Sequence, residues 1–123
     1  MLEKYNENSN DKKQIDIFLN STLSKLGLNY ANLGTRYFKE IIKLAYFNNF
    51  TDVKYKDLCS ILSKQLNVSI RKINSNIYNS INSINIALAK KNFADIFNMD
   101  FDYFYISPKK FTILFLNLLY NTF

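Results

Sequence analysis

Apolar residues recur along most of this chain at intervals of three and four, which is the spacing of one face of an α-helix. The clearest case is "NVSIRKINSNIYNSI", residues 67 to 81, in which Ile70 begins a run of four isoleucines at these intervals. Ile84 and Leu88 continue the stripe, so the predicted helix extends to residue 89 or 90. We expect all four isoleucines to face the core.

The same periodicity predicts the remaining helices at residues 13 to 29, 35 to 48, 55 to 67 and 109 to 121, with a short helix at 93 to 97. Only two glycines and one proline interrupt the chain, which favours long helices. The fold class is therefore all-α, a compact bundle of about five to six helices containing a helix-turn-helix. Residues 1–12 are expected to be a flexible N-terminal tail, and residues 13–123 one domain.

Some residues have specific expected places in these helices. Thr35 can cap the second helix, and Thr51 or Asp52 the third. Pro108 suits the start of the last helix. The charged residues of the second helix are expected to stay in water, namely Arg36, Lys39, Glu40 and Lys43.

The helix-turn-helix is predicted where two amphipathic helices are separated by "NVS", only three residues. Asn67 is one of the few non-glycine residue types that tolerate a positive φ, and Ser69 can cap the second helix. In DNA-binding proteins of this kind, the second helix enters the major groove.

The polar residues of that second helix suit DNA recognition. Arg and Lys bind phosphate or guanine, Asn pairs with adenine, and Ser and Tyr hydroxyls contact bases or backbone. A solvated surface helix in an Asn-rich chain would also carry such residues. We expect base contacts from Lys72, Ser75, Asn76 and Asn79, with Ser69, Arg71, Asn74 and Tyr78 beside them, and phosphate contacts from Lys54, Lys56, Lys64, Lys90 and Lys91.

Charge and composition narrow the function further. The net charge of +6 favours a polyanionic partner, either nucleic acid or an anionic membrane surface. There is no His and only one Cys, Cys59, so the common His- and Cys-based catalytic and metal sites are excluded, and we expect no cofactor and no enzyme activity. A single Cys, expected to be buried, also fits a cytoplasmic location.

We find no segment in the sequence with the features of a signal peptide or a membrane span. The N-terminus lacks the apolar core of a signal peptide. The C-terminal run "FTILFLNLLYNTF" is about 13 residues long, short of the roughly 20 that a membrane span needs. We interpret it as a buried helix or as a contact between subunits.

Three passages resemble, in order, the C-terminal DNA-binding (effector) domain of the stage-zero sporulation response regulator family of Firmicutes. "LGLNYANLGTRYFKEII" (26–42) is similar to that domain's opening helices, and "ILSKQLNVSIRKINSNIYNSI" (61–81) to its helix-turn-helix. "ISPKKF" resembles the entry to its final helix. The resemblance covers residues 13–123. It implies a six-helix fold that binds double-stranded DNA as a head-to-tail homodimer and controls transcription through RNA polymerase.

The chain also departs from that family. The family's recognition helix is rich in Arg and carries a Glu, whereas this chain keeps a basic residue at Lys72 and has Asn74, Ser75 and Tyr78 at the other matching positions. Fewer charged contacts favour a different, more AT-rich target. The N-terminal tail is too short for the family's phosphorylated receiver domain, so we expect an effector domain without it.

The leading hypothesis is a sequence-specific DNA-binding transcriptional regulator. A related alternative is an accessory protein that marks a plasmid or phage DNA site. A different alternative is a protein-interaction module that has lost its DNA contacts and antagonises a full-length homologue through the apolar C-terminal helix.

Overall fold

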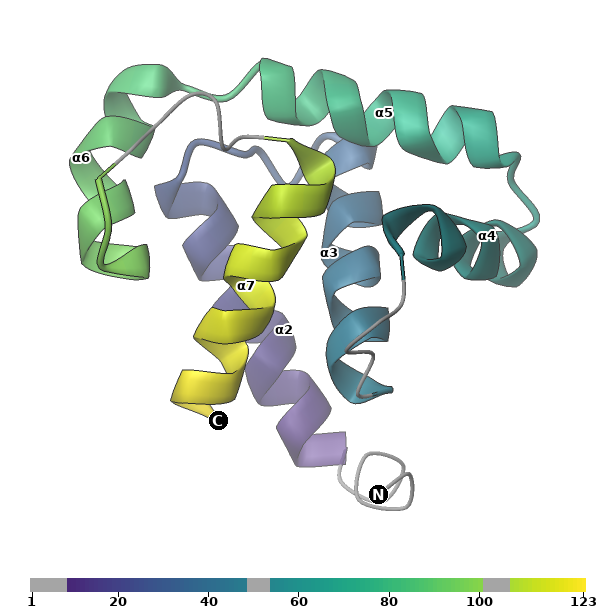
Figure 1. The fold of residues 1–123 in the computed structure, drawn as a ribbon, viewed down its shortest axis with the longest axis horizontal. Helices are drawn as coiled ribbons and strands as arrows, with labels where there is room; N and C mark the ends of the chain where they lie inside the picture. The colour runs from purple at the N-terminus through teal and green to yellow at the C-terminus, as the bar shows by residue number, and fades with distance from the viewer. Residues whose placement is uncertain (1–8, 49–53, 101–106) are drawn as a thin grey trace.

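The computed structural model describes residues 9–48, 54–100 and 107–123, and these residues form an all-α fold (Figure 1). The predicted bundle of five to six helices is confirmed. None of the described helices combines the length and apolar character that a membrane span requires. Within the described residues the helices are α2 (Ser9–Lys25), α3 (Leu33–Phe47), α4 (Tyr55–Leu66), α5 (Ile70–Asn82), α6 (Ile86–Phe97) and α7 (Pro108–Thr122).

Helix α3 is the centre of the arrangement, and it packs against α2, α4, α5 and α7. In Figure 1, α5 lies across one end of the bundle, with α4 and α6 at its two ends. Phe38 of α3 is fully buried, and its ring contacts those of Phe111 and Phe115 at centroid distances of 5.7 and 5.9 Å. This apolar centre gives α5 a rigid base, since well-packed interiors yield little to applied strain.

Helix α5 is fixed to the bundle through Ile73, Ile77 and Ile81, all of them buried. Each buried side chain of this kind contributes about 1.5–3 kcal/mol. The prediction that Ile70 joins them is wrong, because its side chain is 46% exposed. Ile70 is the first residue of α5, and the closest approach to α3 comes more than one turn later, at Asn76.

The predicted extension of this helix to residue 89 or 90 is also wrong. Helix α5 ends at Asn82, and Asn85 has an extended conformation with φ −76° and ψ 104°. The Asn85 side chain caps α6 by accepting a hydrogen bond from the Leu88 N–H at 3.1 Å. The predicted short helix at 93 to 97 is therefore the second half of α6. Two helices share one apolar stripe, because Ile84 in the link is buried as well.

Two other predicted boundaries change. Helix α3 begins at Leu33 after the cap residue Asn32, so Thr35 is a buried residue inside the helix and does not cap it. Helix α2 begins at Ser9, so the last four residues of the predicted flexible tail are helical. Residues 1–8 and the predicted caps Thr51 and Asp52 lie outside the described residues.

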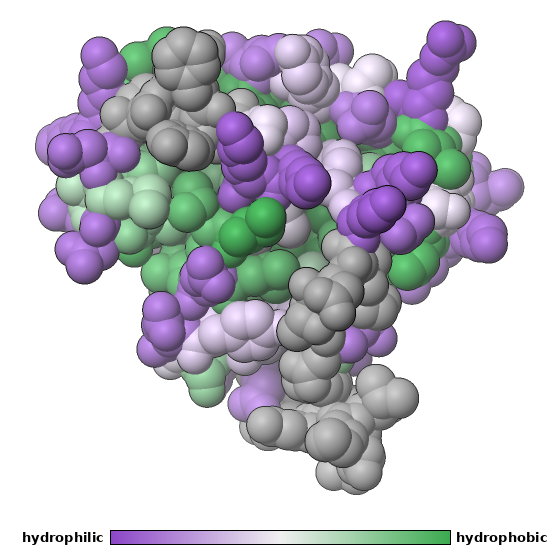
Figure 2. Space-filling model, in the orientation of Figure 1, coloured by the Kyte–Doolittle hydropathy of each residue, from purple (hydrophilic) through white to green (hydrophobic). Residues whose placement is uncertain are grey.

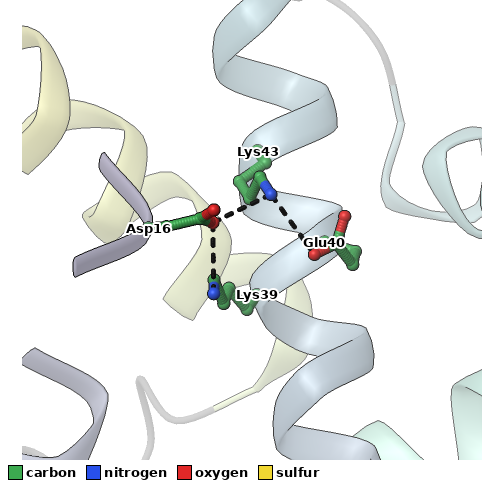
Figure 3. A network of polar contacts seen from close by, with 4 residues as sticks. All are labelled: Asp16, Lys39, Glu40 and Lys43. Atoms are coloured by element: carbon green, nitrogen blue, oxygen red, sulfur yellow. Dashed lines mark hydrogen bonds and ion pairs between the residues drawn. The ribbon is translucent and has the colours of Figure 1, made fainter. Parts of the chain in front are cut away.

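The carboxylate of Asp16 joins α2 to α3 by binding two lysines (Figure 3). Its Oδ1 lies 3.1 Å from Lys39 Nζ and 2.9 Å from Lys43 Nζ, and Lys43 also pairs with Glu40 at 3.4 Å. Burial disfavours the charged form of Asp16, but the two lysines outweigh this effect and hold its pKa below the ordinary value. Lys39, expected in water, is buried and lies over the Tyr30 ring.

Candidate nucleic-acid interface

The connection from α4 to α5 is a tight three-residue turn. Asn67 adopts the left-handed conformation, with φ 56° and ψ 45°, and the Val68 N–H donates to the Ser63 carbonyl at 3.2 Å. The Ser69 hydroxyl accepts a hydrogen bond from the Lys72 N–H at 3.1 Å and so caps α5. The predicted roles of Asn67 and Ser69 are confirmed. The assignment of this unit as a DNA-binding motif stays a prediction.

One side of α5 faces solvent, and its residues are polar or basic. The helix contains no Asp or Glu, so no carboxylate of its own opposes an approaching phosphate. Tyr78 is the more exposed of the two large hydrophobic residues that α5 exposes, at 54% against 46% for Ile70. The residues predicted to contact DNA that are exposed on α5 are Arg71, Lys72, Asn74, Ser75, Tyr78 and Asn79.

Asn76 does not lie with this group. It is half-buried, and its Nδ2 donates to the Lys72 carbonyl at 2.8 Å. Its own carbonyl faces Gly34 of α3. Ser80 of α5 is also buried, at 6% exposed, and its hydroxyl lies beside Gly34, so the side of α5 packed on α3 includes polar residues as well as isoleucines. Asn76 therefore lies outside the outward face, contrary to the predicted arrangement.

The region around α4 and α5 carries most of the net charge of the chain. Between residues 54 and 82 there are five basic residues and one acidic residue, Asp57, a net charge of +4 against +6 for the whole chain. Lys54, Lys56 and Lys64 are all exposed. Such a local excess of positive charge attracts polyanions and speeds their association.

Lys90 and Lys91 are exposed as predicted, but α6 carries them, and α6 lies at the opposite end of α5 from α4 (Figure 1). A helix of 13 residues, such as α5, is roughly 20 Å long. The structure therefore does not bring these two lysines together with Lys64. They could meet a long duplex that lies along the whole of α5.

Lys109 and Lys110 are two further candidates for phosphate contact that the sequence patterns do not single out. Both are exposed in the first turn of α7, and α7 packs against α5. Residues so far from α5 along the chain are placed near it only by the tertiary fold. No local pattern could have assigned them to this surface.

Among the described residues, no group of three or more His, Cys, Asp or Glu side chains is placed to hold a metal ion. Cys59 is buried as expected, and burial raises the pKa of its thiol, so the reactive thiolate is disfavoured. Burial likewise raises the pKa of Tyr55, which lies one helical turn before it.

No protein family, curated protein or solved structure matches the chain. The resemblance to the sporulation effector domain stays a prediction from the sequence passages quoted above. The function is therefore argued from the surface formed by α4, the turn and α5.

Proposed function

We propose that this chain is a sequence-specific DNA-binding protein that regulates transcription in the cytoplasm, with α5 lying in the major groove of double-stranded DNA. One observation carries the proposal. A helix anchored by three buried isoleucines exposes an outward face of basic, amide and hydroxyl side chains without a carboxylate, beside three exposed lysines of the α4 region.

The dimensions and chemistry of this face fit the groove. The major groove is about 12 Å wide and admits one α-helix. In this arrangement Arg71 and Lys72, in the first turn of α5, contact phosphates or guanine, while Asn74 and Asn79 pair with adenine. The lysines at 54, 56 and 64 neutralise phosphates.

The resemblance to the sporulation effector domain supports the same function and adds partners. Regulation of transcription would bring RNA polymerase into contact with the protein, and binding to tandem half-sites would bring a second copy of the chain. RNA polymerase and a second copy of the chain are therefore the proposed protein partners.

Selection of bound sites from random DNA duplexes, repeated at two salt concentrations, tests the proposal. We expect one enriched sequence at both concentrations, bound more weakly by the Lys72→Ala variant. Lys25→Ala, which removes an exposed lysine of α2, is the matched control and should leave affinity for the enriched site unchanged. Selection without enrichment would contradict the proposal.

A second candidate function is association with another protein through α7. Ile113, Tyr120 and Phe123 are 49%, 44% and 50% exposed, and Figure 2 shows apolar side chains gathered over α6 and α7. Because Phe111, Phe115 and Leu119 are buried, the opposite side of α7 already forms core. Gel filtration of the chain alone, and a pull-down with a full-length homologous regulator, test this candidate with Ile113→Lys as the comparison. A monomer that does not bind the regulator would count against it.

A further inference from the structure

Ile70 is an exposed apolar side chain beside the α4–α5 turn, and Leu66, the last residue of α4, is another at 44% exposed. Ile70 is the first residue of α5, it follows the capping residue Ser69, and it is 46% exposed. Single exposed apolar residues are common and need no explanation by themselves. The neighbours of Ile70 make this one unusual, because exposed Arg71 and Lys72 follow it directly in the same turn.

Ile70 also begins a row along α5. Residues four apart lie near one another on a helix, each turned about 40° further around its axis, so Ile70, Asn74 and Tyr78 form a slanting row. The row starts at Ile70, on the side of the buried isoleucines, and leads toward the outward face. All three residues of the row are exposed. At a rise of 1.5 Å per residue, the eight steps from the first to the last cover about 12 Å. The row therefore presents an aliphatic side chain, an amide and an aromatic ring along about the width of a major groove.

The major groove offers a partner for each of the first two groups. The thymine C5-methyl is the apolar group that base pairs present there, and the adjacent adenine presents N7 and N6, which an Asn amide can pair with bidentately. The cationic neighbours favour a polyanion and disfavour an uncharged protein partner for this surface. An apolar groove on a protein would also bury the Asn74 amide without a hydrogen-bond partner, which costs free energy.

We propose that Ile70 is a specificity-determining residue that contacts a thymine methyl group, while Asn74 pairs with adenine in the same or the next base pair. Ile70 and Asn74 then select A·T pairs where the first two turns of α5 meet the bound site. This inference rests on the proposed DNA-binding function and adds the identity of the bases that the first two turns of α5 recognise.

Replacement of thymine by deoxyuridine tests the inference, because it removes only the methyl group. Each thymine of the selected site is replaced in turn, and the Kd is measured for the unaltered chain and for Ile70→Ala. At one position we expect the unaltered chain to lose about fourfold in affinity for the duplex. This is the effect on binding of removing one buried methyl group from the interface. Ile70→Ala should bind the thymine duplex more weakly and show no further loss with deoxyuridine at that position.

Ile86→Ala is the matched control. Ile86 is also the first residue of its helix, follows a capping Asn85, and is 38% exposed, but it lies at the other end of α5. This variant should keep the full loss with deoxyuridine. If no position is sensitive to the methyl group, or if Ile70→Ala keeps the same sensitivity, Ile70 does not read thymine. If the chain binds no duplex sequence selectively, the proposed function itself is wrong as well.

Discussion

Gly34 of α3 lies directly against the backbone of Asn76 in α5. A Cβ atom at position 34 would be 2.0 Å from the Asn76 carbonyl oxygen and 2.3 Å from the Ser80 hydroxyl oxygen. The two helices therefore approach each other more closely than any residue with a side chain would allow. This contact fixes the distance of α5 from the core, and with it the face of α5 that solvent meets.

Gly34→Ala should therefore destabilise the protein, although alanine is the better helix former by up to about 1 kcal/mol. Because the nearest atom belongs to the backbone of α5, the whole helix must shift, and overpacking of this kind costs about 1–3 kcal/mol. Urea denaturation measures the change. Adding Ser80→Ala removes only the hydroxyl contact, so the double variant should remain less stable than the unaltered chain. Full recovery in the double variant would show that the side chain, and not the backbone, limits the approach.

The turn at Asn67 gives a second prediction. A β-branched residue resists the left-handed conformation, so Asn67→Val should cost about 1–2 kcal/mol and weaken DNA binding by misplacing the start of α5. Asn98 ends α6 in nearly the same conformation, with φ 57° and ψ 39°, and supplies the control. Asn98→Val should lose similar stability and keep its affinity for DNA. Equal loss of DNA affinity in both variants, measured while both are folded, would contradict a specific role of the α4–α5 turn.

Local chemistry explains which features the sequence predicts well. Asn67 and Ser69 act within three or four residues of themselves, through a backbone conformation and a cap, so the sequence alone identifies both. The helical character of the segments follows from apolar periodicity in the same way. The apolar neighbours of Cys59 likewise predict that it is buried, and it is.

The wrong predictions concern features that depend on the neighbours in space. Ile70 continues the apolar stripe, yet it is 46% exposed at the start of α5, and Lys39 is buried, where Asp16 of another helix pairs with it. The stripe also passes without a break from α5 into α6, which hid the end of α5 at Asn82. Apolar periodicity predicts which side of a helix is apolar, but it does not predict which residues of that side another helix covers or where the helix ends.

The contact of Asp16 with two lysines predicts a dependence of stability on pH. The pKa of Asp16 is lower in the folded chain than its ordinary value of 3.8. The stability that the charged Asp16 contributes to the folded chain is therefore complete above pH 3.8, and it is lost as the pH falls through the folded pKa. Asp16→Asn should cost about 1–2 kcal/mol near neutral pH. This is less than the 3–5 kcal/mol of a fully buried pair, because Asp16 is 37% exposed and water screens it.

Urea denaturation of both proteins between pH 7 and pH 2 checks this expectation. The difference in unfolding free energy should shrink as the pH falls below the ordinary pKa. Glu40→Gln is the control and should cost less, because among the described residues Glu40 pairs only with the partly exposed Lys43, at 3.4 Å. A difference between the unaltered chain and Asp16→Asn that does not vary with pH would rule out the ion pairs as its cause.

The salt dependence of DNA binding separates the two groups of lysines. Each phosphate contact that is removed should reduce the slope of log K against log salt by about 0.9. We expect this change in slope for Lys64→Gln, because Lys64 lies on α4 beside the start of α5. We expect a smaller change for Lys90→Gln, because Lys90 lies on α6. Fluorescence anisotropy titrations at several salt concentrations supply both slopes. Equal changes would mean that the DNA lies along the full length of α5 and reaches α6.

The central claim is that the outward face of α5 reads base sequence, and one measurement tests it most directly. This is the ratio of affinities for the selected duplex and for a shuffled duplex of the same composition, measured at one salt concentration. We expect a ratio of about 10³ or more for the unaltered chain. Asn74→Ala should lower it by about 10- to 100-fold, as expected for loss of a bidentate pair with adenine. Asn121→Ala, which removes an exposed amide of α7, should leave it unchanged. A ratio near one for the unaltered chain, or equal ratios for the chain and Asn74→Ala, would contradict the account.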